Sequence, residues 1–209
     1  MATKAKRAEV QTERQDLTIP PIDVKMAGFT IRGISPVLSH ALGGYEGKSM
    51  EGPKNKQKTR DLEAEFRASL YPVPGHAGAF GIPAAAFKSA IVDACRYVDG
   101  MKATLVRGAL YVLGDVIEIR DAKPRLRRDV ARIGRFPTRT PDLRVRGEFP
   151  LPWSALLPIR FSASVLSVPQ IANLLNNAGF SVGVGDWRPA KCGSFGQFSV
   201  ASADFIDRV

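Results

Sequence analysis

The sequence predicts an α+β fold, and three observations carry this prediction. Apolar residues occupy every second position from Leu157 to Val165, which is typical of a strand with one buried face. The segments 83–98 and 167–177 repeat apolar residues at three- and four-residue spacing instead, which favours amphipathic helices. Further strand-like segments precede and follow each helix, so both kinds of element are expected to share one core.

Six segments are expected to form that core. The predicted strands are 23–34, 103–119, 153–165 and 195–201, and the predicted helices run from Pro83 to Gly100 and from Ser167 to Asn177. Proline fits the first turn of a helix, where its missing N–H has no helical partner, and serine is a good N-cap. Gly114-Asp115 could turn 103–119 into a hairpin. This order is the split βαβ order of a ferredoxin-like sheet.

One tail and two excursions complete the expected organisation. Residues 1–20 are expected to form a flexible N-terminal arm, and 21–209 a single domain. The insertion 35–82 combines a loop rich in Gly and Lys, a short helix over 60–71 and a second loop over 71–81. Pro124, Pro137 and Pro141 interrupt the segment 120–150, so a protruding hairpin fits it better than one long helix.

Composition excludes several classes of protein. The two cysteines, Cys95 and Cys192, exclude a disulfide-rich scaffold and a cysteine-based zinc cage. Cys95 falls on the apolar face of its predicted helix, where a core position is expected. No apolar segment approaches the roughly 20 residues of a membrane-spanning helix, and the first residues lack the apolar stretch of a signal peptide. A cytoplasmic protein without a membrane partner, cofactor or metal is the expectation.

The positive charge is concentrated in one segment. The chain carries a formal net charge of +10, and residues 120–146 contribute +7 of it. Arginine offers a rigid fork of donors to phosphates, so a polyanionic partner is expected, although a solvated hairpin without a partner is the alternative. The basic residues of the segment are Arg120, Lys123, Arg125, Arg127, Arg128, Arg132, Arg135, Arg139, Arg144 and Arg146. A secondary basic loop holds Lys48, Lys54, Lys56, Lys58 and Arg60.

A glycine-rich loop, residues 179–198, follows the second predicted helix. Its five glycines allow close backbone approaches, and successive N–H groups in such loops can cradle phosphates. Gly183-Val-Gly185 is not a dinucleotide-binding fingerprint, because it follows a helix and not a strand. Arg188 and Lys191 add charge, and Trp187 could stack on a base or attach the loop to its own domain or to a neighbouring subunit.

Two segments together resemble a known family. Val182-Gly-Val-Gly-Asp-Trp-Arg-Pro, with Gly193-Ser-Phe-Gly196, and Ile82-Pro-Ala-Ala-Ala-Phe-Lys88 are similar to the RAMP superfamily, especially its small phage and mobile-element relatives. These are the RRM-like subunits of CRISPR effector complexes. The resemblance implies a ferredoxin-like palm, a hairpin thumb at 120–146, helical oligomerisation and single-stranded nucleic acid bound along the filament. Some relatives cut RNA with an aspartate after the first strand, but 35–44 contains none.

The leading hypothesis is a non-enzymatic subunit that oligomerises along single-stranded nucleic acid, guide RNA or other RNA more than DNA. It would form the backbone of a CRISPR-effector-like or phage nucleoprotein complex, with other effector-complex subunits as further candidate partners. One alternative is a phage assembly protein whose basic arm binds an acidic partner. The other is an RNA-processing endonuclease that uses His40 or His76 as a general base. Phe136 could insert between bases or pack into the next subunit. The candidate contacts are Lys88, Arg120, Lys123, Arg125, Arg127, Arg128, Arg132, Arg135, Phe136, Arg139, Gly183, Gly185, Trp187, Arg188 and Lys191.

Overall fold

The main sheet has four antiparallel strands in the order β10–β1–β9–β5. The structure is a computed structural model that describes residues 19–41, 61–133 and 140–205. The strands are β1 (Val24–Gly33), β5 (Leu110–Val112), β9 (Ser154–Ser162) and β10 (Phe198–Phe205). β1 and β9 pair with Phe29 opposite Leu157 and Ala27 opposite Ile159, and all four side chains are buried. The predicted α+β fold is confirmed, and the strands of its main sheet are antiparallel.

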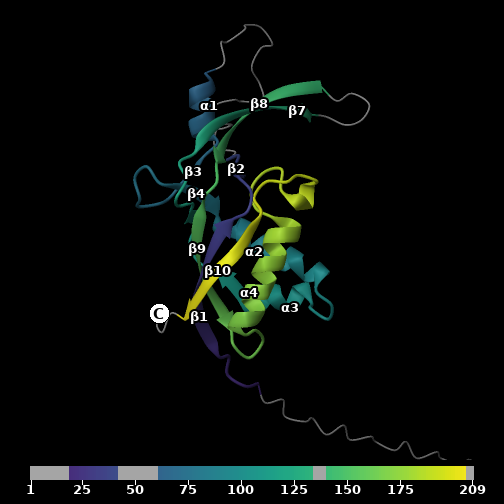
Figure 1. The fold of residues 1–209 in the computed structure, drawn as a ribbon. Coiled ribbons are helices and arrows are strands. Elements are labelled where there is room, and N and C mark those ends of the chain that lie inside the picture. Colours follow the sequence, from purple (N-terminus) through teal and green to yellow (C-terminus); the bar gives the residue numbers. More distant parts are fainter. Residues whose placement is uncertain (1–18, 42–60, 134–139, 206–209) are drawn as a thin grey trace, which may run out of the picture.

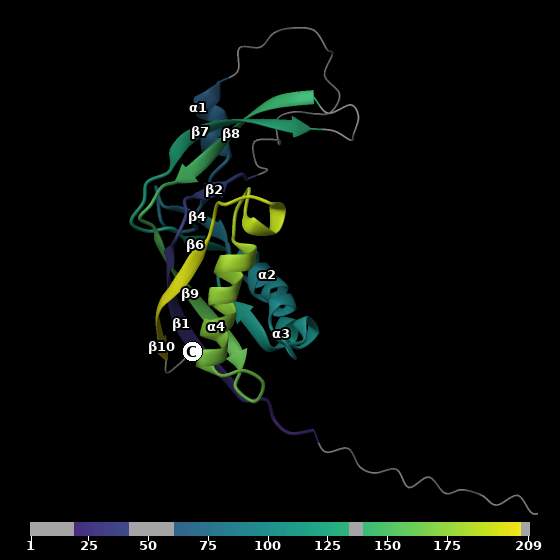
Figure 2. The same cartoon turned by 45° about the vertical axis from the view of Figure 1, so that its right-hand side comes forward.

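Two helices cover one face of this sheet (Figures 1 and 2). α2 (Ala84–Ala94) follows β1 along the chain and buries Phe87 and Ile91. α4 (Val168–Asn177) lies between β9 and β10 and begins with a capping box, in which Ser167 and Gln170 satisfy each other's backbone N–H groups. A short π-helical turn, η3 (Ala178–Val182), continues α4 into the glycine-rich loop. The glycine-rich loop, which follows α4, and the first turn of α2 therefore lie at the same end of the sheet.

A second sheet lies beyond that end (Figures 1 and 2). It contains β2 (Val37–Ser39), β8 (Thr140–Phe149) and β7 (Arg125–Ile133), in the order β2–β8–β7. β7 and β8 form the antiparallel hairpin expected between 120 and 150. Helix α1 (Leu62–Ala68) lies against it, and Leu70 packs so closely on Gly147 that a Cβ there would overlap it. The hairpin is thus held by a helix on one face and by β2 at one edge.

Three sequence expectations need correction. The segment 103–119 is not one strand-like unit: it contains α3 (Ala103–Ala109), β5 and β6 (Val116–Glu118), and the two strands belong to different sheets. The loop expected over 71–81 contains β3 (Tyr71–Pro72) and β4 (Phe80–Pro83), which join β6 in a third sheet. The first helix ends at Ala94, before a 3₁₀ turn, and not at Gly100. Residues 1–18 and 42–60 lie outside the described part of the chain.

Side-chain spacing explains the missed helix. Ala103, Val106 and Ala109 follow each other at three-residue intervals, and the last two are buried. The apolar face of α3 is therefore built mostly from alanine, whose weak hydrophobic signal is easily outweighed by the neighbouring Leu105, Leu110 and Val112. No helix in the described ranges is long and apolar enough to cross a membrane.

Candidate nucleic-acid interface

The two faces of the β7–β8 hairpin differ in chemistry. Because side chains alternate along a strand, Arg125, Arg127 and Asp129 share one face of β7. The register places Arg127 opposite Arg146 and Arg125 opposite Glu148, so these β8 residues lie on the same face. The opposite face holds Val145 and Gly147 and packs toward α1. The polar face is directed toward the glycine-rich loop, as its contacts show.

An ion-pair chain connects the hairpin to the loop. Each of its three carboxylates lies between two nitrogen-bearing side chains, so charges of opposite sign alternate along it. Arg127 lies 2.9 Å from Glu148 and 3.0 Å from Asp129, and Arg146 lies 3.0 Å from Asp129. Arg146 also reaches across to Asp186 at 2.9 Å. In spatial order the chain is Arg125, Glu148, Arg127, Asp129, Arg146, Asp186 and His40.

Aromatic rings of the loop strengthen the same junction. The guanidinium of Arg146 lies 4.7 Å from the centre of the Trp187 ring, and that of Arg127 lies 4.8 Å from the centre of the Phe195 ring. Desolvated cation–π contacts of this kind contribute up to about 2 kcal/mol each. Trp187 therefore packs against the hairpin of its own chain, which was one of the two roles open from the sequence.

Backbone contacts fix the loop against β2. The N–H of Asp186 donates to the carbonyl of Leu38 at 2.9 Å, and the N–H of Gly196 donates to that of Pro36 at 2.8 Å. Gly196 has a φ of 69°, and a Cβ at this position would fall on the carbonyl oxygen of Val184. Only glycine combines the left-handed backbone with this close approach. The conformation that presents Asp186 to Arg146 is thus set by the main chain.

Two carboxylates of the ion-pair chain, Asp186 and Glu148, have lowered pKa values. The contact with His40, aided by Arg146, lowers the pKa of Asp186 despite partial burial of the carboxylate. Burial alone would raise the pKa of Glu148, but hydrogen bonds from Arg127 and Arg125 outweigh it and lower the pKa. Three arginines and three carboxylates then cancel, so the chain is close to neutral when His40 is neutral. Arg125 and Arg127 are therefore partly committed to internal partners.

Positive charge nevertheless remains on the hairpin and the loop. We define the hairpin–loop surface as residues 123–130, 143–149 and 183–197, which hold eight cationic side chains and three carboxylates, a net charge of +5. All three carboxylates are members of the ion-pair chain. Within the described residues, no carboxylate pairs with Lys123, Arg128, Arg144 or Lys191. Together with Arg188, which donates to a backbone carbonyl, these four cations carry the charge of +5 that is free to meet an external anion. Arg128 lies opposite Val145 and so projects from the other face of the hairpin.

The remaining predicted contacts lie elsewhere or outside the described residues. Arg120 pairs with Glu118 at 3.2 Å. Lys88 lies 3.8 Å from the centre of the Tyr111 ring on β5, with Arg160 at 5.9 Å from the same ring, away from the glycine-rich loop. Gly183 and Gly185 belong to the loop and pack against Pro189 and Leu38. The side chains of Arg132, Arg135, Phe136 and Arg139 and the basic residues from Lys48 to Arg60 lie outside the described part of the chain.

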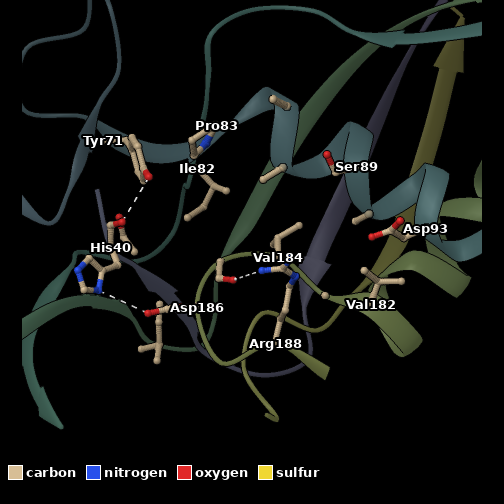
Figure 3. Close-up of a pocket in the computed structure, with 17 residues that line it drawn as sticks. His40, Tyr71, Ile82, Pro83, Ser89, Asp93, Val182, Val184, Asp186 and Arg188 are labelled. Atoms are coloured by element: carbon tan, nitrogen blue, oxygen red, sulfur yellow. Dashed lines mark hydrogen bonds and ion pairs between the residues drawn. The ribbon is translucent and has the colours of Figure 1, made fainter. Parts of the chain in front are cut away.

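A cavity of about 350 Å³ opens between α2 and the glycine-rich loop (Figure 3). It brings together the two segments that carry the family resemblance. Tyr71 and His40 lie at one end, where the hydroxyl of Tyr71 donates to the carbonyl of His40 at 3.4 Å and Nδ1 of His40 lies 3.5 Å from Asp186. Arg188 enters the cavity and donates to the carbonyl of Gly185 at 3.1 Å. His76 is exposed in the β3–β4 turn and does not line the cavity.

Sequence reasoning missed the carboxylates that organise this site. Asp129 stands two residues after Arg127, and Glu148 two residues after Arg146, so each pair shares one face of its strand. That spacing was a usable signal for pairing within the hairpin. The contribution of Asp186 had no such signal, because it depends on how the loop folds back. Among the described residues, no group of three or more potential ligands is placed to hold a metal ion.

Comparison with known proteins gives a limited result. No protein-family model matches the sequence, and no curated protein matches it. Among solved structures, the crystal structure of Cmr6 from Pyrococcus furiosus is similar, with a TM-score of 0.47 and 11% sequence identity. The similarity covers 86% of this chain and 98% of that chain.

Proposed function

We propose that this chain binds single-stranded nucleic acid, RNA in preference to DNA, along the hairpin–loop surface. The observation that carries the proposal is the net charge of +5 on that surface, where every carboxylate is already paired within the ion-pair chain. Paired carboxylates repel an approaching phosphate less than free ones, whereas Lys123, Arg128, Arg144 and Lys191 keep their full attraction. Binding of this kind follows the backbone and depends little on sequence.

The finer proposal is a non-enzymatic RAMP-like subunit that repeats along the strand as a homo-oligomer. The resemblance of the segments 82–88 and 182–196 supports it. The order of the main sheet, β10–β1–β9–β5, with α2 and α4 on one face, fits the split βαβ arrangement that the resemblance implies. The basic hairpin is the segment that the resemblance implies to be a thumb.

Purification without nuclease tests this proposal. The expected result is an absorbance ratio raised by co-purified nucleic acid that RNase removes and DNase leaves, together with filaments in negative-stain micrographs. A clean absorbance ratio with an intact oligomer would contradict it. That result would favour the alternative in which the basic hairpin binds an acidic protein partner.

The contact between His40 and Asp186 favours a second candidate function, metal-independent RNA cleavage. Because Nδ1 of His40 lies 3.5 Å from the carboxylate of Asp186, Nε2 is the ring nitrogen left to accept a proton from a reacting hydroxyl. The side chain of His40 is 22% exposed at the edge of the cavity, within reach of a bound strand. Incubation of labelled RNA with the wild type, His40→Ala and His76→Ala distinguishes this cleavage from binding alone. Cutting that only His40→Ala abolishes would establish an enzyme, and absence of cutting by the wild type would exclude this candidate.

A further inference from the structure

We propose that the cavity between α2 and the glycine-rich loop receives one unstacked nucleobase of the bound strand. This inference rests on the proposed function and adds a base-binding site to a surface otherwise suited to phosphates. Its volume, about 350 Å³, lies in the range of pockets that hold small organic ligands, roughly 300–1,000 Å³. Three properties of the cavity support a base as its occupant: its walls, its polar groups and its position.

The walls suit a flat ring. On one side, α2 presents the small side chains Ala86, Ser89 and Ala90, and on the other side the loop presents Val184 between two glycines. Ile82 also lines the cavity and is almost completely buried. Because the side chains on both walls are short, a planar group has room to insert between the helix and the loop. Transfer of an apolar ring face from water to such walls is favourable.

The polar groups of the cavity fit the edge of a base. Arg188 uses one of its five N–H groups on Gly185 and keeps the others for a ligand. The hydroxyl of Ser89 makes no hydrogen bond to another described residue. Asp93 stands farther along the same face of α2, where Arg96 holds one of its oxygens at 3.4 Å. Donors from Arg188 and acceptors from Ser89 and Asp93 match the mixed donor and acceptor edges of nucleobases.

The cavity opens beside the proposed path of the strand. Asp186 lines the cavity (Figure 3). It also contacts Arg146 of the hairpin, so the cavity adjoins the rest of the hairpin–loop surface. A base of a single strand needs only to leave its stack to enter, which costs at most a few kcal/mol. Contacts with the walls and Arg188 can offset that cost. The mouth of the cavity therefore lies where a strand held by its phosphates would present its bases.

The test compares two strands of equal length and charge, an RNA oligonucleotide and the same backbone without bases. Ser89→Leu fills the cavity from an exposed helical position, and Ser89→Ala is the matched control that removes the hydroxyl without filling the space. We expect Ser89→Leu to weaken binding of the RNA about tenfold, the loss typical of one base contact, while the abasic strand binds as before. Ser89→Ala should change either affinity by less than about threefold.

The outcomes are distinguishable. If Ser89→Leu binds both strands with wild-type affinity, the base-binding inference is wrong while the proposed function stands. If the wild type binds neither strand, both are wrong. Circular dichroism melting confirms that each variant is folded, and Ala85→Leu, at a second exposed position beside the cavity, repeats the experiment if Ser89→Leu does not fold. Contacts of bases with Trp187 or Phe195 would be unaffected by either substitution.

Discussion

The guanidinium Nε of Arg146 lies 2.9 Å from the carboxylate of Asp186, and this contact joins the β7–β8 hairpin to the glycine-rich loop. Arg146 is only 1% exposed, whereas Asp186 is 35% exposed. The arginine also contacts Asp129 and the ring of Trp187. The two segments that the sequence singled out separately therefore form one surface, and Arg146 lies at its centre as a structural residue.

Replacement of Arg146 should destabilise the protein. Arg146→Met keeps much of the side-chain volume but leaves Asp129 and Asp186 without their shared partner, so the free energy of unfolding should fall by about 3 kcal/mol. The measurement is urea denaturation followed by circular dichroism. Arg128→Met is the matched control, because Arg128 is exposed and should change stability by less than about 0.5 kcal/mol. Equal effects of the two substitutions would contradict the structural role.

The glycine-rich loop should be sensitive at Gly196. Gly196→Ala places a Cβ on the carbonyl of Val184 and also strains a backbone with φ of 69°. Gly78→Ala is the control, since it has a φ of 79° but open space around it. We expect Gly78→Ala to cost about 1 kcal/mol from the backbone alone and Gly196→Ala clearly more. If the close approach to Val184 is required, the melting temperature of Gly196→Ala should be lower than that of Gly78→Ala. Equal melting temperatures would show that only the left-handed backbone matters.

Local features were the predictable part of this fold. The alternation in β9 and the Ser167 cap of α4 each depend on residues close in sequence, and both lie where the sequence places them. The helix α3 was missed because its buried face relies on alanine. The ion-pair chain could not be predicted as a whole, since it depends on the hairpin register that sets Arg127 opposite Arg146 and on the loop that returns Asp186.

The ion-pair chain predicts loss of stability in acid. The pKa values of Asp186 and Glu148 are lowered in the folded state, so their contribution is complete above the unfolded values near 4 and is lost as the pH falls through the folded values. The melting temperature of the wild type should therefore fall between about pH 5 and pH 2. The double variant Asp186→Asn, Glu148→Gln should have a lower melting temperature at neutral pH, and that temperature should fall less on acidification. Parallel curves for the two proteins would contradict this assignment.

The two cysteines should report on the loop. Cys192 is exposed, whereas Cys95 is buried and burial raises the pKa of its thiol. A thiol reagent should therefore modify Cys192 quickly in the native state and Cys95 only on unfolding. Bound single-stranded RNA should slow modification of Cys192 severalfold if the loop contacts the strand. Cys192→Ser provides the blank, and an unchanged rate under saturating RNA would place the strand elsewhere.

The salt dependence of RNA affinity tests the central claim most directly. The dissociation constant of a single-stranded RNA is measured by filter binding across a range of salt concentrations. The wild type is compared with a variant in which Lys123, Arg128, Arg144 and Lys191 are replaced by glutamine. The control variant replaces four exposed cations outside the hairpin–loop surface and the cavity by glutamine, namely Lys25, Arg32, Lys102 and Arg107.

We expect steep salt dependence for the wild type and the control. Each lost phosphate contact should reduce the slope by about 0.7, so the first variant should lose up to about 3 units of slope and most of its affinity. A wild-type affinity that barely changes with salt would contradict the proposal, and so would equal slopes for the two variants.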